Sequence, residues 1–177
     1  MGLEGVEVLC GGPIKSLFSG GVFDAGMREL VTETVAVLQA AGALVRSAHL
    51  AERFSIVDLS SQDVTRRDHA WCVSCDVYVA LLPTDAEGTA YPSAGTAVEL
   101  GWVSALGKPI VVLWDSSRPR AYSHLVRGLN AISPVVFLDL LEARANPGLL
   151  VETVERAGRS PGAGPKGGRL LAHGHPQ

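Results

Sequence analysis

One carboxylate stands out because it lies in a segment that is otherwise suited to a buried helix. Glu99 falls within an apolar run that opens at Thr96 and stops at Gly107, with Pro109 close behind. Thr96 is expected to be the helix N-cap, since its hydroxyl can accept a backbone N–H, and Gly107 is expected to end the helix. A carboxylate in the first turn of such a helix, after a strand, lies where α/β proteins bind ligands. Glu99 is therefore the first candidate for chemistry on a bound molecule.

The same spacing has a purely structural interpretation. Thr96 and Glu99 fit a capping box, in which the glutamate side chain accepts a bond from the Thr96 backbone N–H. In that arrangement Glu99 would stabilise the helix and do no chemistry. The spacing alone leaves both interpretations open.

A second carboxylate, Asp68, precedes an apolar strand-forming run that begins at Asp76. Asp68 could contact a ligand bound near Glu99. The alternative is an ion pair with Arg66 or Arg67 on a solvated helix face, where most charged side chains lie. Asp76 is expected to be structural and to bond the backbone where the strand begins.

Backbone donors and a cation follow the first expected strand, in the segment Cys10-Gly-Gly-Pro-Ile-Lys15-Ser16. Gly11 and Gly12 would let a ligand lie against the chain, and Lys15 or Ser16 could hold a phosphate. The alternative is an ordinary strand-to-helix turn with a solvated lysine. The spacing matches neither a dinucleotide-binding fingerprint nor a P-loop.

These candidates need a scaffold, and the chain alternates between strand-forming and helix-forming segments. Strands are expected at residues 6–10, 43–47, 76–82, 109–114 and 135–138, and helices at 25–41, 63–74, 96–106, 122–129 and 148–157. This alternation predicts an α/β fold with a doubly wound, five-stranded parallel sheet of order 2-1-3-4-5, flavodoxin-like or Rossmann-like. In that order the loops 11–24 and 82–96 meet where ligands bind.

Composition limits the partners and the location. The chain has 177 residues and a net charge of −3, so nucleic acid is not an expected partner. No apolar run is long enough to cross a bilayer and the start lacks a basic region before an apolar one, so we expect no membrane association and a cytoplasmic location. We expect one catalytic domain over residues 1–157 and a Gly/Pro-rich flexible tail over 158–177.

The cysteines are an odd count in a chain of this size, which argues against a disulfide framework. Cys72 and Cys75 have redox or zinc spacing, but the sequence holds no second pair. We expect Cys10, Cys72 and Cys75 to be buried, inert thiols, and predict no metal site.

The most specific motif surrounds Glu99. Ser93-Ala-Gly-Thr-Ala-Val-Glu99-Leu-Gly-Trp, with Gly107-Lys-Pro109, resembles the signature of the nucleoside 2-deoxyribosyltransferase superfamily, and the similarity covers roughly residues 6–140. The resemblance implies that Glu99, ionised at neutral pH, is the nucleophile that attacks the anomeric carbon. It implies that Asp68 contacts or protonates the departing base. Two carboxyl groups with separate roles suit an oxocarbenium-like transition state, and no metal or organic cofactor is implied.

The resemblance also bears on the substrate. Members that act on free nucleosides carry a carboxylate at the position of Ser93, whereas the nucleotide hydrolases carry a serine. A carboxylate would repel a 5′-phosphate, while the Ser93 hydroxyl and the helix-opening N–H groups near Gly95 would donate to it. An ordinary loop serine is the alternative. Deoxynucleotide-selective members have a tyrosine near the end of the first strand, where Val8 stands here.

Within the superfamily, four sequence segments most resemble the CMP and hydroxymethyl-CMP hydrolases of nucleoside-antibiotic pathways. These segments are Gly11-Gly12-Pro13, Ala48-His49, residues 92–102 and residues 125–129. Those enzymes have an aromatic residue packing on the base where Ile14 stands here. The base therefore stays open between cytosine, a modified pyrimidine and a purine.

The segment Arg127-Gly-Leu-Asn-Ala-Ile-Ser133 resembles the one from which related dimeric hydrolases send a serine into the neighbour's phosphate site. The resemblance implies that Ser133 is a ligand in trans and that the protein is a homodimer or larger, with a shared active site. A turn serine before Pro134 is the alternative.

The sequence thus predicts a hydrolase that cleaves the N-glycosidic bond of a pyrimidine nucleoside 5′-monophosphate, with CMP preferred. The alternatives are a 2′-deoxynucleoside 5′-monophosphate hydrolase, a nucleoside 2-deoxyribosyltransferase, and a nucleotide-binding sensor without enzymatic activity.

Overall fold

The structure is a computed structural model that describes residues 2–19, 21–55 and 59–159. Its centre is a parallel sheet of order β4-β1-β5-β6-β7. Counted along the chain this order is 2-1-3-4-5, so the predicted topology is confirmed. The strands are β1 (Glu7–Gly11), β4 (Leu44–Arg46), β5 (Val77–Leu82), β6 (Ile110–Trp114) and β7 (Val135–Asp139).

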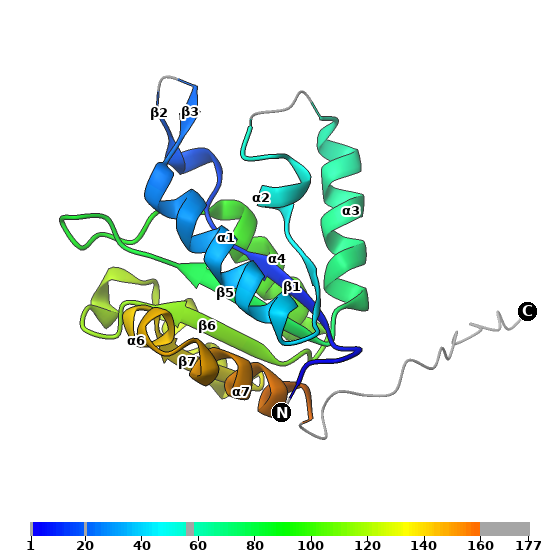
Figure 1. Ribbon diagram of the computed structural model, residues 1–177. Coiled ribbons are helices and arrows are strands. Elements are labelled where there is room, and N and C mark those ends of the chain that lie inside the picture. Colours follow the sequence, from blue (N-terminus) through cyan, green and yellow to red (C-terminus); the bar gives the residue numbers. More distant parts are fainter. Residues whose placement is uncertain (1, 20, 56–58, 160–177) are drawn as a thin grey trace, which may run out of the picture.

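Helices cover both faces of the sheet, as a doubly wound fold requires (Figure 1). One face carries α1 (Ala25–Ala40), α6 (Leu140–Ala145) and α7 (Pro147–Gly158), and the other carries α3 (Ser61–Ser74) and α4 (Ala94–Ala105). The connections contain α2 (Ala48–Ala51), α5 (His124–Arg127) and the 3-10 turns η1 (Lys15–Leu17), η2 (Pro119–Ala121) and η3 (Leu129–Ala131). Within the described ranges no helix is both long and apolar enough to cross a membrane.

The buried strands feed two separate cores because successive side chains of a strand point to opposite faces. Val77 and Val79 of β5 pack in the core shared with α1 and α7. Tyr78 and Ala80, the residues that follow each of these valines, pack in the core that contains Leu100 of α4. Strand alternation therefore places the hydroxyl of Tyr78 on the α3–α4 side of the sheet.

The start of α4 differs from the prediction. Its N-cap is Ser93, whose Oγ accepts the backbone N–H of Thr96 at 3.2 Å, so the assignment of Thr96 as the cap was wrong. Thr96 is instead buried inside the first turn, where its Oγ1 lies 2.7 Å from Ser93 Oγ. The earlier cap wins because it lets the Thr96 side chain pack inward while both hydroxyls stay bonded. The predicted end is confirmed: Gly107 adopts a φ of 66°, in the left-handed region.

Asp76 has the structural role predicted for it. Its Oδ2 accepts the backbone N–H of Glu7 at 2.9 Å, and its own N–H donates to the Glu7 carbonyl at 2.7 Å. This pair of bonds joins the starts of β1 and β5, the two strands between which the sheet order reverses.

Several small elements were not predicted. The loop after β1 contains an antiparallel hairpin, β2 (Phe18–Ser19) with β3 (Val22–Phe23), which projects beside the start of α1 in Figure 1. The segments α2 and α6 were missed as well, because four to six residues are too few to show helical periodicity. The last helix reaches Gly158, and residues 160–177 of the predicted tail lie outside the described residues.

Candidate active site

Glu99 faces the sheet from the first turns of α4, and its carboxylate is held by a tyrosine. The hydroxyl of Tyr78 donates to Glu99 Oε2 at 2.6 Å. The capping-box interpretation is therefore wrong, since the Thr96 N–H that Glu99 would have accepted is bonded to Ser93. The carboxylate does not cap the helix, and it lies beside Gly11 at the carboxyl end of β1.

Gly11, the last residue of β1, lies directly beneath this pair. A Cβ at position 11 would come within 2.6 Å of Glu99 Oε2 and closer still to the Tyr78 hydroxyl. Real Cβ atoms do not approach oxygen so closely, so only glycine fits there. The predicted closeness of Gly11 to the site is explained by this contact with Glu99.

The surroundings of Glu99 disfavour its charge. Burial raises the pKa of Glu99 from 4.5 to about 7, the Tyr78 hydrogen bond lowers it, and the negative charge of Asp68 raises it further. The neutral form of Glu99 is therefore more favoured than it is in an exposed glutamate.

Asp68 belongs to an ion-pair cluster beside Glu99. Arg67 donates from Nε to Asp68 Oδ1 at 2.8 Å and from Nη2 to Glu52 Oε1 at 2.7 Å. The pairing with Arg67 foreseen as an alternative exists, but the Asp68 side chain is only 14% exposed and does not lie on a solvated face. Arg67 lowers the pKa of Glu99, whereas Asp68 and Glu52 raise it, so all of these charges act on one site.

The glycine loop after β1 is fixed by a buried histidine. Nε2 of His49 lies 3.0 Å from the Pro13 carbonyl, which can only accept, so the imidazole donates through Nε2–H. Burial lowers the pKa of His49, which keeps the ring neutral and lets Nδ1 accept from the Ser47 hydroxyl at 3.3 Å. Gly12 is also confined, because a Cβ there would lie 3.0 Å from the Leu81 carbonyl oxygen.

The next two candidates continue from this loop. Ile14 is half-buried and packs against the core on the α1 face, and Lys15 is exposed at the start of η1. Of this loop, Gly11 is the residue whose contact with Glu99 the structure shows, whereas Gly12 faces Leu81 and Met27. A ligand-binding role for Gly12, Ile14 and Lys15 stays a prediction.

The start of α4 presents donors at the edge of the same site. Ser93 is the N-cap, and Ala94 and Gly95 are exposed in the first turn, where backbone N–H groups have no partner within the helix. A cavity of about 250 Å³ adjoins this helix start, lined in part by Tyr91, Ser93 and Tyr122. Glu99 and Asp68 are outside its lining, so this cavity adjoins the start of α4 and does not enclose either carboxylate.

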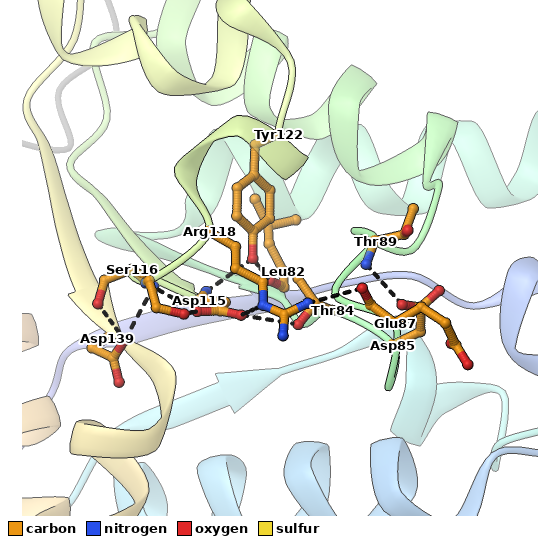
Figure 2. Close-up of polar contacts among 11 residues, drawn as sticks. Leu82, Thr84, Asp85, Glu87, Thr89, Asp115, Ser116, Arg118, Tyr122 and Asp139 are labelled. Atoms are coloured by element: carbon orange, nitrogen blue, oxygen red, sulfur yellow. Dashed lines mark hydrogen bonds and ion pairs between the residues drawn. The ribbon is translucent and has the colours of Figure 1, made fainter.

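The loop between β5 and α4 is held in place by a polar network, shown in Figure 2. Arg118 donates to the Glu87 carbonyl at 2.8 Å, which ties the tip of the loop to the segment after β6. The Tyr122 hydroxyl donates to the Leu82 carbonyl at 2.8 Å and accepts the Asp115 N–H at 2.9 Å. These bonds fix the path of the chain from the end of β5 towards the start of α4.

Ser133 lies apart from the other candidates within one chain. Its Oγ bonds Ser104 Oγ at 2.5 Å, beside the C-terminal half of α4. Beside it, α4, α5 and η3 border an apolar groove of about 680 Å³, at which Leu125 and Ile132 are 85% and 78% exposed. A role for Ser133 in its own chain's site is not supported by this placement, and a role in trans stays a prediction.

The cysteines are buried, as predicted. Burial raises the pKa of Cys10, Cys72 and Cys75 to about 12, so these thiols stay protonated and unreactive at neutral pH. Among the described residues, no group of three or more His, Cys, Asp or Glu side chains is placed to hold a metal ion.

Comparison with known proteins decides the family. The model of the nucleoside 2-deoxyribosyltransferase family matches residues 17–157, which is most of the chain. The chain belongs to this family. The match includes Asp68, Ser93 and Glu99, and it extends through α7. The comparison with curated proteins found no match.

Solved structures of similar fold agree with this family. BlsM, known from a solution structure, is 28% identical at a TM-score of 0.65, over 85% of this chain and 92% of that one. The CMP N-glycosidase BcmB of Clostridium botulinum is 22% identical at a TM-score of 0.58, over 81% and 98% of the two chains. A 2-desoxiribosyltransferase from Leishmania mexicana is 19% identical at a TM-score of 0.51, over 83% and 97%. The last two similarities show a shared fold, and the family is one of enzymes that act on nucleosides.

Sequence reasoning about the family site missed Tyr78 altogether and gave Glu52 no role. A signal for Tyr78 was present, because a tyrosine within the buried run Val77–Leu82 needs a partner for its hydroxyl. The sequence did not say which partner, since the donor on β5 and the acceptor on α4 meet only after the strand has packed against the helix. Glu52 follows α2 and carries no comparable signal.

Gly11→Ala is predicted to destabilise the protein by about 1–3 kcal/mol, because the new methyl group overlaps the Tyr78 hydroxyl and Glu99 Oε2. Thermal unfolding measures the loss. The matched control is Gly148→Ala in the first turn of α7, where a Cβ would meet its nearest neighbour at 3.4 Å. Equal melting temperatures for the two variants would contradict the close approach at Gly11.

Glu99→Gln is predicted to stabilise the protein more at pH 8.5 than at pH 5. The folded protein holds the Glu99 proton more tightly than the unfolded chain, so its stability falls as pH rises from about 4.5 to about 7. A neutral glutamine removes a penalty of up to about 3 kcal/mol, since each pKa unit is worth about 1.4 kcal/mol. Chemical unfolding at both pH values measures the gain, with the exposed Glu142→Gln as a control for loss of one charge. A gain that is the same at both pH values would disprove the raised pKa.

Proposed function

We propose that the protein hydrolyses the N-glycosidic bond of a nucleoside 5′-monophosphate, with CMP or a modified CMP preferred, to free base and ribose 5-phosphate. The observation that carries this proposal is the Glu99 carboxylate. It is partly buried beside Gly11 at the carboxyl end of β1, with one oxygen bonded to Tyr78 and with Asp68 as a neighbouring carboxylate.

The proposed reaction proceeds in two displacements. Ionised Glu99 attacks C1′ as the bond to the base breaks, and Asp68 hydrogen-bonds or protonates the departing base. Water then attacks C1′ of the ribosyl ester and releases the carboxylate, so that one water is consumed overall. The product keeps the configuration at C1′, as in retaining glycosidases. The reaction as proposed uses no metal or organic cofactor.

The start of α4 is the proposed binding place for the 5′-phosphate. The Ser93 hydroxyl and the free N–H groups of Ala94 and Gly95 are donors, and the positive end of the helix dipole favours an anion there. Gly11, Gly12, Ile14 and Lys15 are proposed to line the sugar and base side, because they follow β1 beside Glu99.

We further propose a homodimer or larger assembly with a shared active site. The apolar groove between α4 and α5, with exposed Leu125 and Ile132, offers a surface that a second copy could cover. Ser133 follows Ile132 at its edge, and its hydroxyl is bonded to Ser104 of α4, which also lines the groove.

The test is base release from CMP, dCMP, AMP, GMP and cytidine, each with and without an added free base, followed by chromatography. We expect CMP to be cleaved faster than cytidine and the added base to change little, and Glu99→Gln to lower the rate at least about a thousandfold. Preference for dCMP would identify a deoxynucleotide hydrolase, and transfer to the added base would identify a transferase. Binding of CMP without any turnover would refute the enzymatic proposal.

Ser93→Asp and Ser93→Asn form a matched pair that tests the phosphate site. Both side chains cap helices well, so α4 keeps its start, and the two differ only in charge. We expect Ser93→Asp to lower kcat/KM for CMP by about tenfold or more relative to Ser93→Asn, through repulsion of the phosphate. Ser93→Asp should cleave cytidine at least as fast as Ser93→Asn, since a carboxylate can accept a hydrogen bond from the 5′-hydroxyl of a free nucleoside. Equal kcat/KM values of the two variants for CMP would contradict the proposal that the 5′-phosphate binds at the start of α4.

A further inference from the structure

Tyr78 is a buried polar group in a strand that is otherwise aliphatic. It is 0% exposed in β5, paired in the sheet with Leu9 of β1 and Ile110 of β6. A buried phenol that lacks a hydrogen bond is costly, and its hydroxyl is bonded to Glu99 Oε2. Burial raises the pKa of Tyr78 well above 10, so the group stays protonated and must be the donor.

The other charged and titratable groups around Glu99 do not replace this donor. From α3, Asp68 raises the pKa of Glu99 and Arg67 lowers it. Arg67 donates its hydrogen bonds to Asp68 and Glu52 and not to Glu99. Glu52, after α2, raises the pKa of Glu99. The remaining neighbours are the protonated thiols of Cys10 on β1 and Cys72 on α3.

We propose that Tyr78 is the positioning residue of the nucleophile, holding Oε2 of Glu99 so that Oε1 is presented to C1′. This inference rests on the proposed function. With Oε2 engaged by the hydroxyl above Gly11, the carboxylate has one free oxygen and a fixed orientation. Such fixing matters, because a displacement of about 1 Å at a reacting atom costs on the order of a hundredfold in rate.

The same bond acts on both halves of the reaction. It favours the ionised carboxylate, which is the form that attacks. When water resolves the ribosyl ester, Glu99 leaves as a carboxylate, and the Tyr78 hydroxyl stabilises the charge that develops on Oε2. The hydroxyl keeps its proton throughout. Because Tyr78 is fully buried, it acts through Glu99 and not directly on the sugar.

Tyr78→Phe tests the proposal, because it keeps the ring and removes only the hydroxyl. We expect kcat/KM for CMP to fall about tenfold to a hundredfold, and the acidic limb of the pH profile to move to higher pH, as Glu99 becomes harder to ionise. Tyr122→Phe is the matched control, since it removes another buried hydroxyl, the donor to the Leu82 carbonyl. Its acidic limb is expected to stay in place. An unshifted acidic limb in Tyr78→Phe would overturn the proposal.

A second readout separates this inference from the proposed function. The NMR signal of the ¹³C-labelled side-chain carboxyl carbon of Glu99 reports the titration of Glu99 without any turnover. This signal is assigned because it is missing from the spectrum of Glu99→Gln. A higher titration midpoint in Tyr78→Phe than in the wild type supports the bond even if no nucleotide is cleaved, in which case only the proposed function fails. Equal midpoints in a folded variant, checked by thermal unfolding, would overturn the inference even if CMP is hydrolysed.

Discussion

The site depends on a carboxylate that is kept in a place unfavourable to its charge. Burial and the nearby Asp68 both push Glu99 towards its neutral form, and the Tyr78 hydroxyl opposes them. The carboxylate is weakly solvated in this place, and its pKa is raised from 4.5 to about 7 as a consequence.

This constraint explains features that seem unrelated along the chain. Glycine is required at position 11 because the hydroxyl and the carboxylate meet above the end of β1. The loop that follows is fixed through the bond between His49 and the Pro13 carbonyl, and the loop between β5 and α4 is fixed through Arg118 and Tyr122. Both connections, one leaving β1 and one entering α4, are thus held by side-chain hydrogen bonds.

Much of the scaffold could be predicted because it follows from local patterns. The continuous apolar run Val77–Leu82 identifies a strand buried on both faces, and alternation with helices of amphipathic pattern predicts the order of the sheet. Glu99 was found for the same reason, since a lone carboxylate in an apolar helix is visible in the sequence. Asp76 was placed correctly because it opens a strand whose first partners are backbone groups.

The remainder depended on contacts between distant segments. Two hydroxyls, Ser93 and Thr96, competed to cap α4, and burial of Thr96 decided between them. The bond from Tyr78 to Glu99 joins a strand and a helix that sequence patterns treat separately, and the Arg67 cluster joins α3 to the segment after α2. The hairpin of β2 and β3 has two residues in each strand, too few for alternation to reveal it.

The central claim is that Glu99 bonds covalently to the sugar during turnover. The most direct test is mass spectrometry of the protein after incubation with a 2′-fluorinated CMP analogue, because an electron-withdrawing fluorine disfavours the oxocarbenium-like transition state and slows release of the intermediate. The account predicts a mass increase equal to one fluorinated pentosyl 5-phosphate, located on the peptide that contains Glu99 and absent in Glu99→Gln. Base release without any adduct, or an adduct on another residue, would contradict it.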